Sequence, residues 1–297
     1  MYSLIFSATL INRYFTDKLM KNILFYKYVR IADPLQWRIA HQKLCDSLKL
    51  KGKVLVATEG INGCLSGEDS AVDDYKNALR ADSLFHDVEF KERVVDGHTF
   101  RKMIVRVRDE IVTFRQNVSP DARAPYIEPA ELKKLYEDKS EFYIIDARNN
   151  YESQVGKFEN AIAPNIETFS EFPRAVAELS HLKDKQVVVY CTGGIRCEKA
   201  SAFMLEQGFS NVRQLHGGII RYGDVCSSDH WEGKCFVFDE RVTLDIDEKN
   251  TCLPITDCLH CGDKSGKYYN CANVECDKRF IACKKCIVQT NRCTECK

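Results

Sequence analysis

The sequence has no apolar run that approaches the ~20 residues needed to cross a bilayer. Its first residues, MYSLIFSATLINRYF, lack both the basic start and the small-residue cleavage site of a signal peptide. It also lacks net charge, since 43 basic residues balance 43 acidic ones, and it has no long repeat or low-complexity tract. We therefore expect a cytoplasmic protein with no membrane partner. A length of 297 residues predicts two or three domains.

Cysteine is abundant, with fifteen residues, but the odd number argues against a complete disulfide framework. Eight of the cysteines fall in the last forty residues, and seven are scattered through the rest of the chain. Without a signal peptide, a reducing compartment is expected, in which cysteine serves metal binding and thiol chemistry.

The first part of the chain predicts a β-α-β-α-β-β order, typical of a ferredoxin-like or acylphosphatase-like α+β sandwich. Residues 1–20 are predicted to be an extension, with Met20 an alternative start, and 21–115 the domain. Asp33-Pro34 suits the start of a helix that runs to about Leu48. Further elements are predicted at 23–31, 53–57 and 69–80, with 87–94 and 102–108 as a hairpin around Asp96-Gly97.

After a proline-containing linker at 116–125, short apolar strands alternate with amphipathic helices. This alternation predicts an α/β domain at 126–232, in which helices cover both faces of a parallel sheet. Residues 233–256 are predicted to connect this domain to a cysteine-rich module at 257–297. The predicted elements of the α/β domain are helices 129–137, 169–179 and 198–207 and strands 142–146, 186–190 and 211–215.

Charge is segregated along the chain, because residues 21–125 are net basic and residues 126–256 net acidic. A polyanion could dock on the basic half, although an ordinary solvated strand face explains the same pattern. The basic side chains of 91–115 are Lys91, Arg93, Arg101, Lys102, Arg106, Arg108 and Arg115.

The segment QVVVY-CTGGIRC-EKASAFMLEQGF predicts a buried strand, a tight glycine loop and a helix. Cys191 then lies at the carboxyl end of a parallel strand, where open α/β sheets place their ligands. Backbone N–H groups of the loop and the positive end of the helix dipole favour a thiolate, and Arg196 adds a fixed positive charge. We therefore predict that Cys191 is nucleophilic, within a loop completed by Thr192, Gly193, Gly194 and Ile195.

Residues 126–232 resemble a rhodanese domain, through IIDARNNYESQVGKFENAIAPNI, the six-residue loop CTGGIR and the closing LHGGIIRYG. This resemblance implies that Cys191 carries a persulfide whose charge Arg196 stabilises. It also implies that Asp146 and Arg148 brace the loop, a surface salt bridge between them being the alternative.

The segments VATEGINGCLSG, RADSLFHDVEFKER and HWEGKCFVFDERVTL are similar to a narrower family, the oxygen-dependent tRNA uridine hydroxylases. The resemblance implies formation of 5-hydroxyuridine at the wobble position, with tRNA as partner and dioxygen as co-substrate. Cys197 belongs to the family pattern, and could act as a resolving thiol or as a small N-cap residue of the next helix.

The resemblance also suggests that Glu59, Gly60, Asn62 and Gly63 line the substrate path, although the residues alone favour a hairpin turn. With these residues we group three basic side chains as candidate tRNA contacts, namely Arg101, Arg106 and Arg108.

Four cysteine pairs occupy the tail, and two such pairs complete one tetrahedral four-thiolate site. The tail therefore predicts two structural zinc ions, with an interleaved or a sequential pairing, and a disulfide cluster as the alternative. The predicted ligands are Cys258, Cys261, Cys271, Cys276, Cys283, Cys286, Cys293 and Cys296.

Three functions compete for this sequence. The first is a tRNA uridine hydroxylase, in which the Cys191 thiolate adds to carbon 6 of uridine and makes carbon 5 electron-rich. The second is a persulfide sulfurtransferase, which the same loop would serve, and the third a zinc-dependent interaction protein. The additional domain at 21–115 favours the first over the second, and no haem, flavin or non-haem-iron motif is present.

Overall fold

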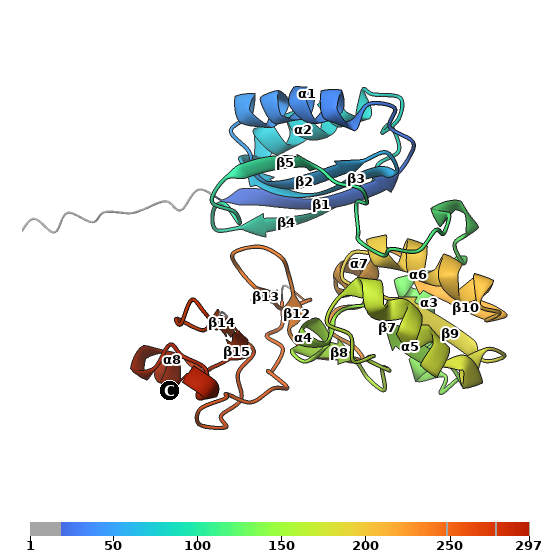
Figure 1. Cartoon of the computed structure of the whole chain (residues 1–297), viewed down its shortest axis with the longest axis vertical. Helices are drawn as coiled ribbons and strands as arrows, with labels where there is room; N and C mark the ends of the chain where they lie inside the picture. Colours follow the sequence, from blue (N-terminus) through green and yellow to red (C-terminus); the bar gives the residue numbers. More distant parts are fainter. Residues whose placement is uncertain (1–18, 248, 277, 297) are drawn as a thin grey trace, which may run out of the picture.

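The computed structural model describes residues 19–247, 249–276 and 278–296, so the predicted extension lies outside the described residues up to position 18. The described chain forms an N-terminal α+β domain, a central α/β domain and a small C-terminal module (Figure 1). Among the helices of this described part, none is long and apolar enough to span a membrane.

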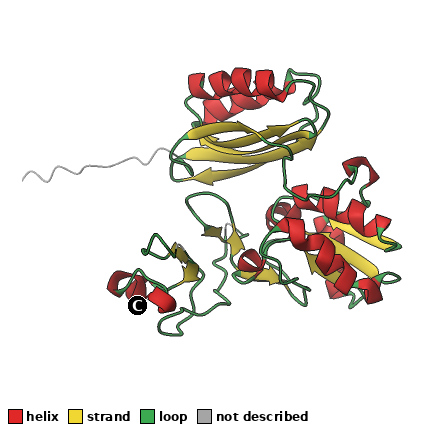
Figure 2. Ribbon diagram, viewed as in Figure 1, coloured by secondary structure: helices red, strands yellow, loops and turns green. Residues whose placement is uncertain are grey.

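The N-terminal domain is a five-stranded sheet with two helices on one face, and this confirms the predicted fold class (Figure 2). The strand order is β4-β1-β3-β2-β5, in which neighbours are antiparallel except for the parallel pair β2 and β5. The elements are β1 (Met20–Tyr28), α1 (Pro34–Ser47), β2 (Lys51–Ala57), β3 (Gly60–Gly67), α2 (Asp69–Arg80), β4 (Phe90–Val95) and β5 (Met103–Val107).

Two local predictions were wrong in this domain. The glycine-rich segment after β2 is a full strand, β3, which pairs with β2 across the two residues Thr58 and Glu59. The predicted hairpin of 87–94 and 102–108 does not form, since β4 and β5 lie at opposite edges of the sheet. The burial of Val105 explains the second error: α1 packs on β5, and this contact places β5 beside β2.

The sheet presents its second face to the rest of the chain (Figure 1). Side chains alternate along β1, so that Ile23 and Phe25 are buried against the helices while Leu24 and Tyr26 point the other way. By the same alternation and the strand registers, β4 and β2 place basic side chains on this open face. The open face thus combines aromatic and basic groups.

The central domain contains a parallel sheet, as predicted, and its strand order is β6-β10-β9-β7. Its strands are β6 (Tyr126–Ile127), β7 (Tyr143–Asp146), β9 (Gln186–Tyr190) and β10 (Asn211–Leu215). Helices α5 and α6 bury apolar side chains on one face, and α3 and α7 on the other. The helices and turns are η1 (Pro120–Ala122), α3 (Pro129–Glu137), α4 (Asn150–Ser153), η2 (Phe169–Glu171), α5 (Phe172–Glu178), η3 (Ser180–Leu182), α6 (Ile195–Glu206) and α7 (Gly218–Cys226).

The C-terminal part packs against the central domain through short strand pairs. β8 (Gly156–Phe158) pairs with β11 (Trp231–Gly233), and β12 (Cys235–Phe236) pairs with β13 (Thr243–Leu244). The cysteine-rich module contains β14 (Tyr268–Asn270), β15 (Arg279–Ile281), α8 (Lys284–Gln289) and η4 (Thr294–Cys296). Tyr268 anchors this module, because its hydroxyl donates a 2.6 Å hydrogen bond to the carbonyl of Tyr151.

Candidate active site and cysteine clusters

The reactive loop follows β9 as the sequence predicted, and it turns directly into α6. Gly194 has φ +101°, a left-handed conformation that favours glycine, and its N–H donates to the sulfur of Cys191 over 3.2 Å. Gly218, from the closing motif, lies against the loop as well. A Cβ there would lie 2.4 Å from the carbonyl oxygen of Cys191, so only glycine permits this packing.

Cys191 is fully buried, and burial by itself would raise the pKa of its thiol. The neighbouring thiol of Cys197, the positive charge of Arg196 and the backbone N–H groups of Arg196 and Gly194 act in the opposite direction. Together they lower the pKa of Cys191 to about 6. Cys191 is therefore mainly a thiolate at neutral pH, in agreement with the argument from the loop sequence.

Arg196 is held in place by Glu152, a residue that the sequence argument missed. Its Nη1 lies 2.5 Å from Oε1 of Glu152 and its Nη2 lies 2.9 Å from Oε2, and both side chains are buried. Nη2 also lies 3.3 Å from the hydroxyl of Thr192. This pairing fixes the guanidinium plane beside the loop.

Asp146 and Arg148 form a wholly buried ion pair, so the surface salt bridge considered from the sequence is wrong. Asp146 also accepts a 2.7 Å hydrogen bond from the hydroxyl of Tyr190, the residue that precedes Cys191. Arg148 donates to the carbonyl of Gly156 over 2.6 Å. These bonds fix the end of β9, where the loop begins.

Cys197 is fully buried in the first turn of α6. It is not the N-cap residue, because the helix begins at Ile195 and Gly194 is the cap. Burial raises the pKa of Cys197, and the nearby Cys191 raises it further. Cys197 therefore remains a protonated thiol that stabilises the Cys191 thiolate.

A cavity of about 700 Å³ opens between the N-terminal sheet, the reactive loop and the segment around β12 and β13. Cys191, Thr192, Gly193, Ile195 and Arg196 line it from the central domain. The sheet contributes side chains of its open face, and the C-terminal segment contributes Phe238 and Arg241. The basic side chains in the lining are Lys53, Lys91, Arg93, Arg115, Arg196 and Arg241.

The predicted substrate-binding residues do not gather in this cavity as a group. Asn62 lines it, but Gly60 and Gly63 are buried within the sheet. Gly60 has φ +144°, and a Cβ at Gly63 would lie 2.2 Å from the ring of Phe25. Both glycines therefore belong to the paired strand β3, and the hairpin turn that the residues alone favoured is formed by Thr58 and Glu59 before them.

Three predicted arginines are exposed near the cavity without lining it. By the alternation of side chains along β5, Arg106 and Arg108 lie on the open face. Lys53 lines the cavity, and its pKa is lowered chiefly by burial and further by the charges of Arg106 and Arg108. Arg101 lies in the connection before β5 and pairs with Glu240 at 3.1 Å.

The two domains are joined at the first turn of α6. Tyr26 donates to Glu198 Oε1 over 2.9 Å, and Tyr126 donates to the same oxygen over 2.7 Å. Lys199, only 3% exposed, lies 2.9 Å from Glu59 and 2.7 Å from Glu110. The alternation of β1 was the one sequence signal that could have marked Tyr26 as facing this interface.

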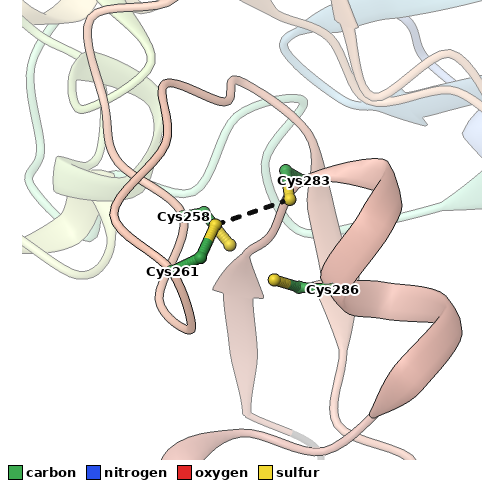
Figure 3. Close-up of side chains that lie close together, drawn as sticks. All are labelled: Cys258, Cys261, Cys283 and Cys286. Carbon is green, nitrogen blue, oxygen red and sulfur yellow. Dashed lines mark hydrogen bonds between the residues drawn. The ribbon is translucent and has the colours of Figure 1, made fainter.

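Two groups of four cysteines close the C-terminal module. One consists of Cys258, Cys261, Cys283 and Cys286, and its sulfurs turn toward a common centre (Figure 3). The other consists of Cys271, Cys276, Cys293 and Cys296. The first cysteine pair thus lies with the third and the second pair with the fourth. This confirms the interleaved arrangement, and the sequential arrangement is wrong.

The donor sets fit a tetrahedral metal ion. All sulfurs of each group lie within 4.8 Å of one another, and Cys261–Cys283 and Cys276–Cys293 are each 3.7 Å apart. A tetrahedral ion with Zn–S bonds of about 2.3 Å would separate its sulfurs by about 3.8 Å. All fifteen cysteines lie in the described part of the chain and all are free, against the disulfide alternative.

Three family models match successive parts of the chain: a UPF0176 acylphosphatase-like domain at 20–111, a rhodanese-like domain at 128–223 and a rhodanase C-terminal region at 232–297. A tRNA uridine(34) hydroxylase from Cytophaga hutchinsonii is 44% identical over 89% of this chain and 85% of its own length. The chain belongs to the tRNA uridine(34) hydroxylase family.

Other members of the family agree with this assignment. The Bacillus licheniformis protein is 42% identical over 88% of this chain and 84% of its own length, and a Staphylococcus aureus protein is 44% identical over 87% and 83%. A solved rhodanese-like domain from Anabaena is 26% identical, covering 37% of this chain and 79% of its own, with a TM-score of 0.32. Membership of the family confirms the predicted enzyme class and favours the hydroxylase over both alternatives.

Proposed function

We propose that this protein hydroxylates the wobble uridine of tRNA at carbon 5, in the cytoplasm, with dioxygen as the oxygen source. The observation that carries the proposal is the cavity in which the Cys191 thiolate faces the open, basic sheet of the N-terminal domain. A sulfurtransferase that accepts only small thiols would need the loop but not this second wall.

Cys191 is the proposed nucleophile. Its thiolate adds to carbon 6 of the uracil, forming a carbon–sulfur bond and moving the electron pair of the 5,6 double bond toward carbon 5 and the carbonyl at carbon 4. Carbon 5 then becomes electron-rich and takes one oxygen atom of dioxygen, while a two-electron reductant and two protons convert the other atom to water. Loss of the carbon 5 proton and departure of the Cys191 thiolate from carbon 6 restore the 5,6 double bond. Arg196 and the N–H of Gly194 hold the thiolate before this step. Thr192, Gly193 and Ile195 form the rest of the loop wall.

The cavity's basic side chains are the proposed contacts for the tRNA backbone. Lys53 and Lys91 lie on the open face, and Arg106 in β5 and Arg108 just after it extend this face; Arg93 is instead held by Asp224. Phosphate contacts of this kind supply affinity that falls with salt. Asn62 is the proposed polar contact inside the cavity, whereas Glu59 acts through its ion pair with Lys199.

Zinc is the metal proposed for the two cysteine groups. Eight sulfur donors and two closed tetrahedral sets suit structural Zn²⁺, and neither set includes a ligand from the reactive loop. The metals would hold the module together and would stay outside the reaction.

The decisive experiment compares tRNA nucleosides from cells that lack this gene after complementation with the wild type, Cys191→Ala or Cys226→Ala. Cys226 is a buried cysteine of the same domain that does not line the cavity, so it controls for the loss of a buried thiol. Mass spectrometry should find 5-hydroxyuridine with the wild type and Cys226→Ala, and none with Cys191→Ala. Purified Cys191→Ala should still bind tRNA with an unchanged salt dependence.

Wild-type levels of 5-hydroxyuridine with Cys191→Ala would refute the catalytic role of Cys191. The sulfurtransferase alternative rests on the same loop geometry, in which N–H groups and Arg196 surround the sulfur. Sulfur transfer from thiosulfate that needs Cys191, together with tRNA that does not change when the gene is removed, would establish that function instead.

A further inference from the structure

Phe238 occupies an unusual position for an aromatic side chain. It is 60% exposed, and among the Phe, Tyr and Trp side chains of the described residues it alone is classed as exposed. It nevertheless lines the cavity that contains Cys191. The other aromatic rings of the described residues are buried or partly buried, which stabilises the fold. The ring of Phe238 is instead exposed to solvent in the cavity and gains little from burial.

The surroundings of Phe238 hold its ring in place. Phe238 follows β12, and its ring packs edge-on against Phe236 with centroids 5.2 Å apart. The next residue, Asp239, forms a bidentate pair with Arg241, which in turn donates to Asn22 of β1 over 3.3 Å. The turn is thereby tied both to its own hairpin and to the N-terminal sheet.

Phe238 also lies close to the reactive loop. The guanidinium carbon of Arg196 is 6.0 Å from the centre of its ring, on the face of the ring. Glu152 holds Arg196 in place, and the turn that carries Phe238 is held by its own contacts. The distance between the ring and the loop that carries Cys191 is therefore fixed.

We propose that Phe238 is the stacking platform for the target uracil, holding the base in the cavity beside Cys191. This inference rests on the proposed function and adds the residue that receives the base. An enzyme that acts on carbon 5 and carbon 6 must take the base out of its stack, and flipped or single-stranded bases stack on aromatic side chains. Stacking presents the flat ring of uracil in a fixed plane, and an attack on carbon 6 requires that plane to be fixed.

The test uses two anticodon stem-loop RNAs, one with uridine at position 34 and one with an abasic site there. Binding of each is measured by fluorescence anisotropy to wild type, Phe238→Ala, Phe238→Tyr and Leu253→Ala. Leu253 is an 81% exposed apolar residue of the same C-terminal segment that does not line the cavity, so it is the matched control. Unchanged melting temperature and metal content verify that each variant is folded.

Phe238→Ala should weaken binding of the uridine RNA by about tenfold, within the range of one base–aromatic stack, and leave the abasic RNA unchanged. Phe238→Tyr, which keeps the ring, should bind both RNAs like the wild type, as should Leu253→Ala. An equal loss for both RNAs, or no loss, would overturn the stacking role. If Phe238 fails this test while the wild type still forms 5-hydroxyuridine in cells, the stacking role is wrong and the proposed function stands. If the wild type forms no 5-hydroxyuridine in cells, both the proposed function and the stacking role are wrong.

Discussion

The hydroxyl of Tyr26 donates a 2.9 Å hydrogen bond to Glu198, and this bond joins the N-terminal sheet to the helix that follows the reactive loop. Gly194 of the loop lies directly beneath the same tyrosine, since a Cβ there would lie 2.9 Å from the hydroxyl oxygen. The loop is therefore shaped by its own domain on one side and by the other domain on the opposite side. The open face of the N-terminal sheet and the loop that carries Cys191 thus share one cavity.

The Tyr26–Glu198 bond should contribute modestly to stability. Tyr26→Phe removes one hydrogen bond but keeps the ring, so the free energy of unfolding should fall by about 1 kcal/mol. Tyr126→Phe is the matched control within the central domain, because Tyr126 donates to the same oxygen of Glu198. Urea denaturation measures the free energy of unfolding of each variant. Because the two bonds share one acceptor, the loss in the double variant should differ from the sum of the losses in the two single variants. Strict additivity would show that the two bonds are independent.

Lys199 should be more important for stability, with an effect that depends on pH. Burial raises the pKa of Glu110, but Lys199 and the N–H groups of Phe114 and Arg115 lower it below its ordinary value of 4.5. This contribution is present above pH 4.5 and is lost as the pH falls through the lower folded pKa. Lys199→Met should therefore destabilise the protein by about 2–3 kcal/mol near pH 7. This loss is smaller than the loss from breaking a fully buried ion pair, because Glu59 and Glu110 are partly exposed.

Denaturation of wild type and Lys199→Met from pH 7 down to pH 3 tests this assignment. The difference between them should shrink below pH 4.5, as protonation removes the charge that Lys199 balances. Lys185→Met is a suitable control, since Lys185 pairs with Glu141 on the surface and should contribute little at any pH. A difference that stays constant over this range would mean that Lys199 acts through packing alone.

Cys191 should be the most reactive thiol outside the C-terminal module. With a pKa of about 6, its alkylation rate should rise between pH 5 and pH 7 and then level off, because the thiolate is the reacting form. Burial raises the pKa of Cys45 and of Cys64 to about 12, so both should remain unlabelled at neutral pH. Iodoacetamide labelling with peptide mapping gives the order, and earlier labelling of Cys45 or Cys64 would contradict the loop assignment.

Metal analysis should find two zinc ions per chain. Because the pairs interleave, one ion would join the first pair to the third and the other the second pair to the fourth. Cys258→Ser should therefore remove one ion and disorder both strands β14 and β15. The central domain should keep its fold, although it loses the contact between Tyr268 and Tyr151. Circular dichroism and metal content during chelation measure these effects. Fewer than one metal ion in the wild type would exclude the structural role.

Local sequence determined the reactive loop and the cysteine pairs. A β-rich run followed by Cys-x-Gly-Gly and a helix places Cys191 at a strand end. Cysteines with two residues between them, or four in the pair Cys271 and Cys276, are spaced to bind one ion. These are short-range geometries, so neighbours in sequence are also neighbours in space. The same locality explains why helices such as 69–80 and 129–137 were predicted with their observed bounds.

Tertiary structure decided what depends on contacts between distant segments. The position of β5 follows from packing under α1, and that of β4 from its pairing with β1, neither of which the turn signal between them reports. The pairing of the cysteines is likewise a choice between arrangements of equal local geometry. Most of the cavity wall, including Lys53, Lys91 and Phe238, comes from segments far from Cys191 in sequence. The contacts of Tyr26 and Lys199 across the domain boundary help to orient the open sheet over the loop, and this orientation brings Lys53 and Lys91 toward the thiolate.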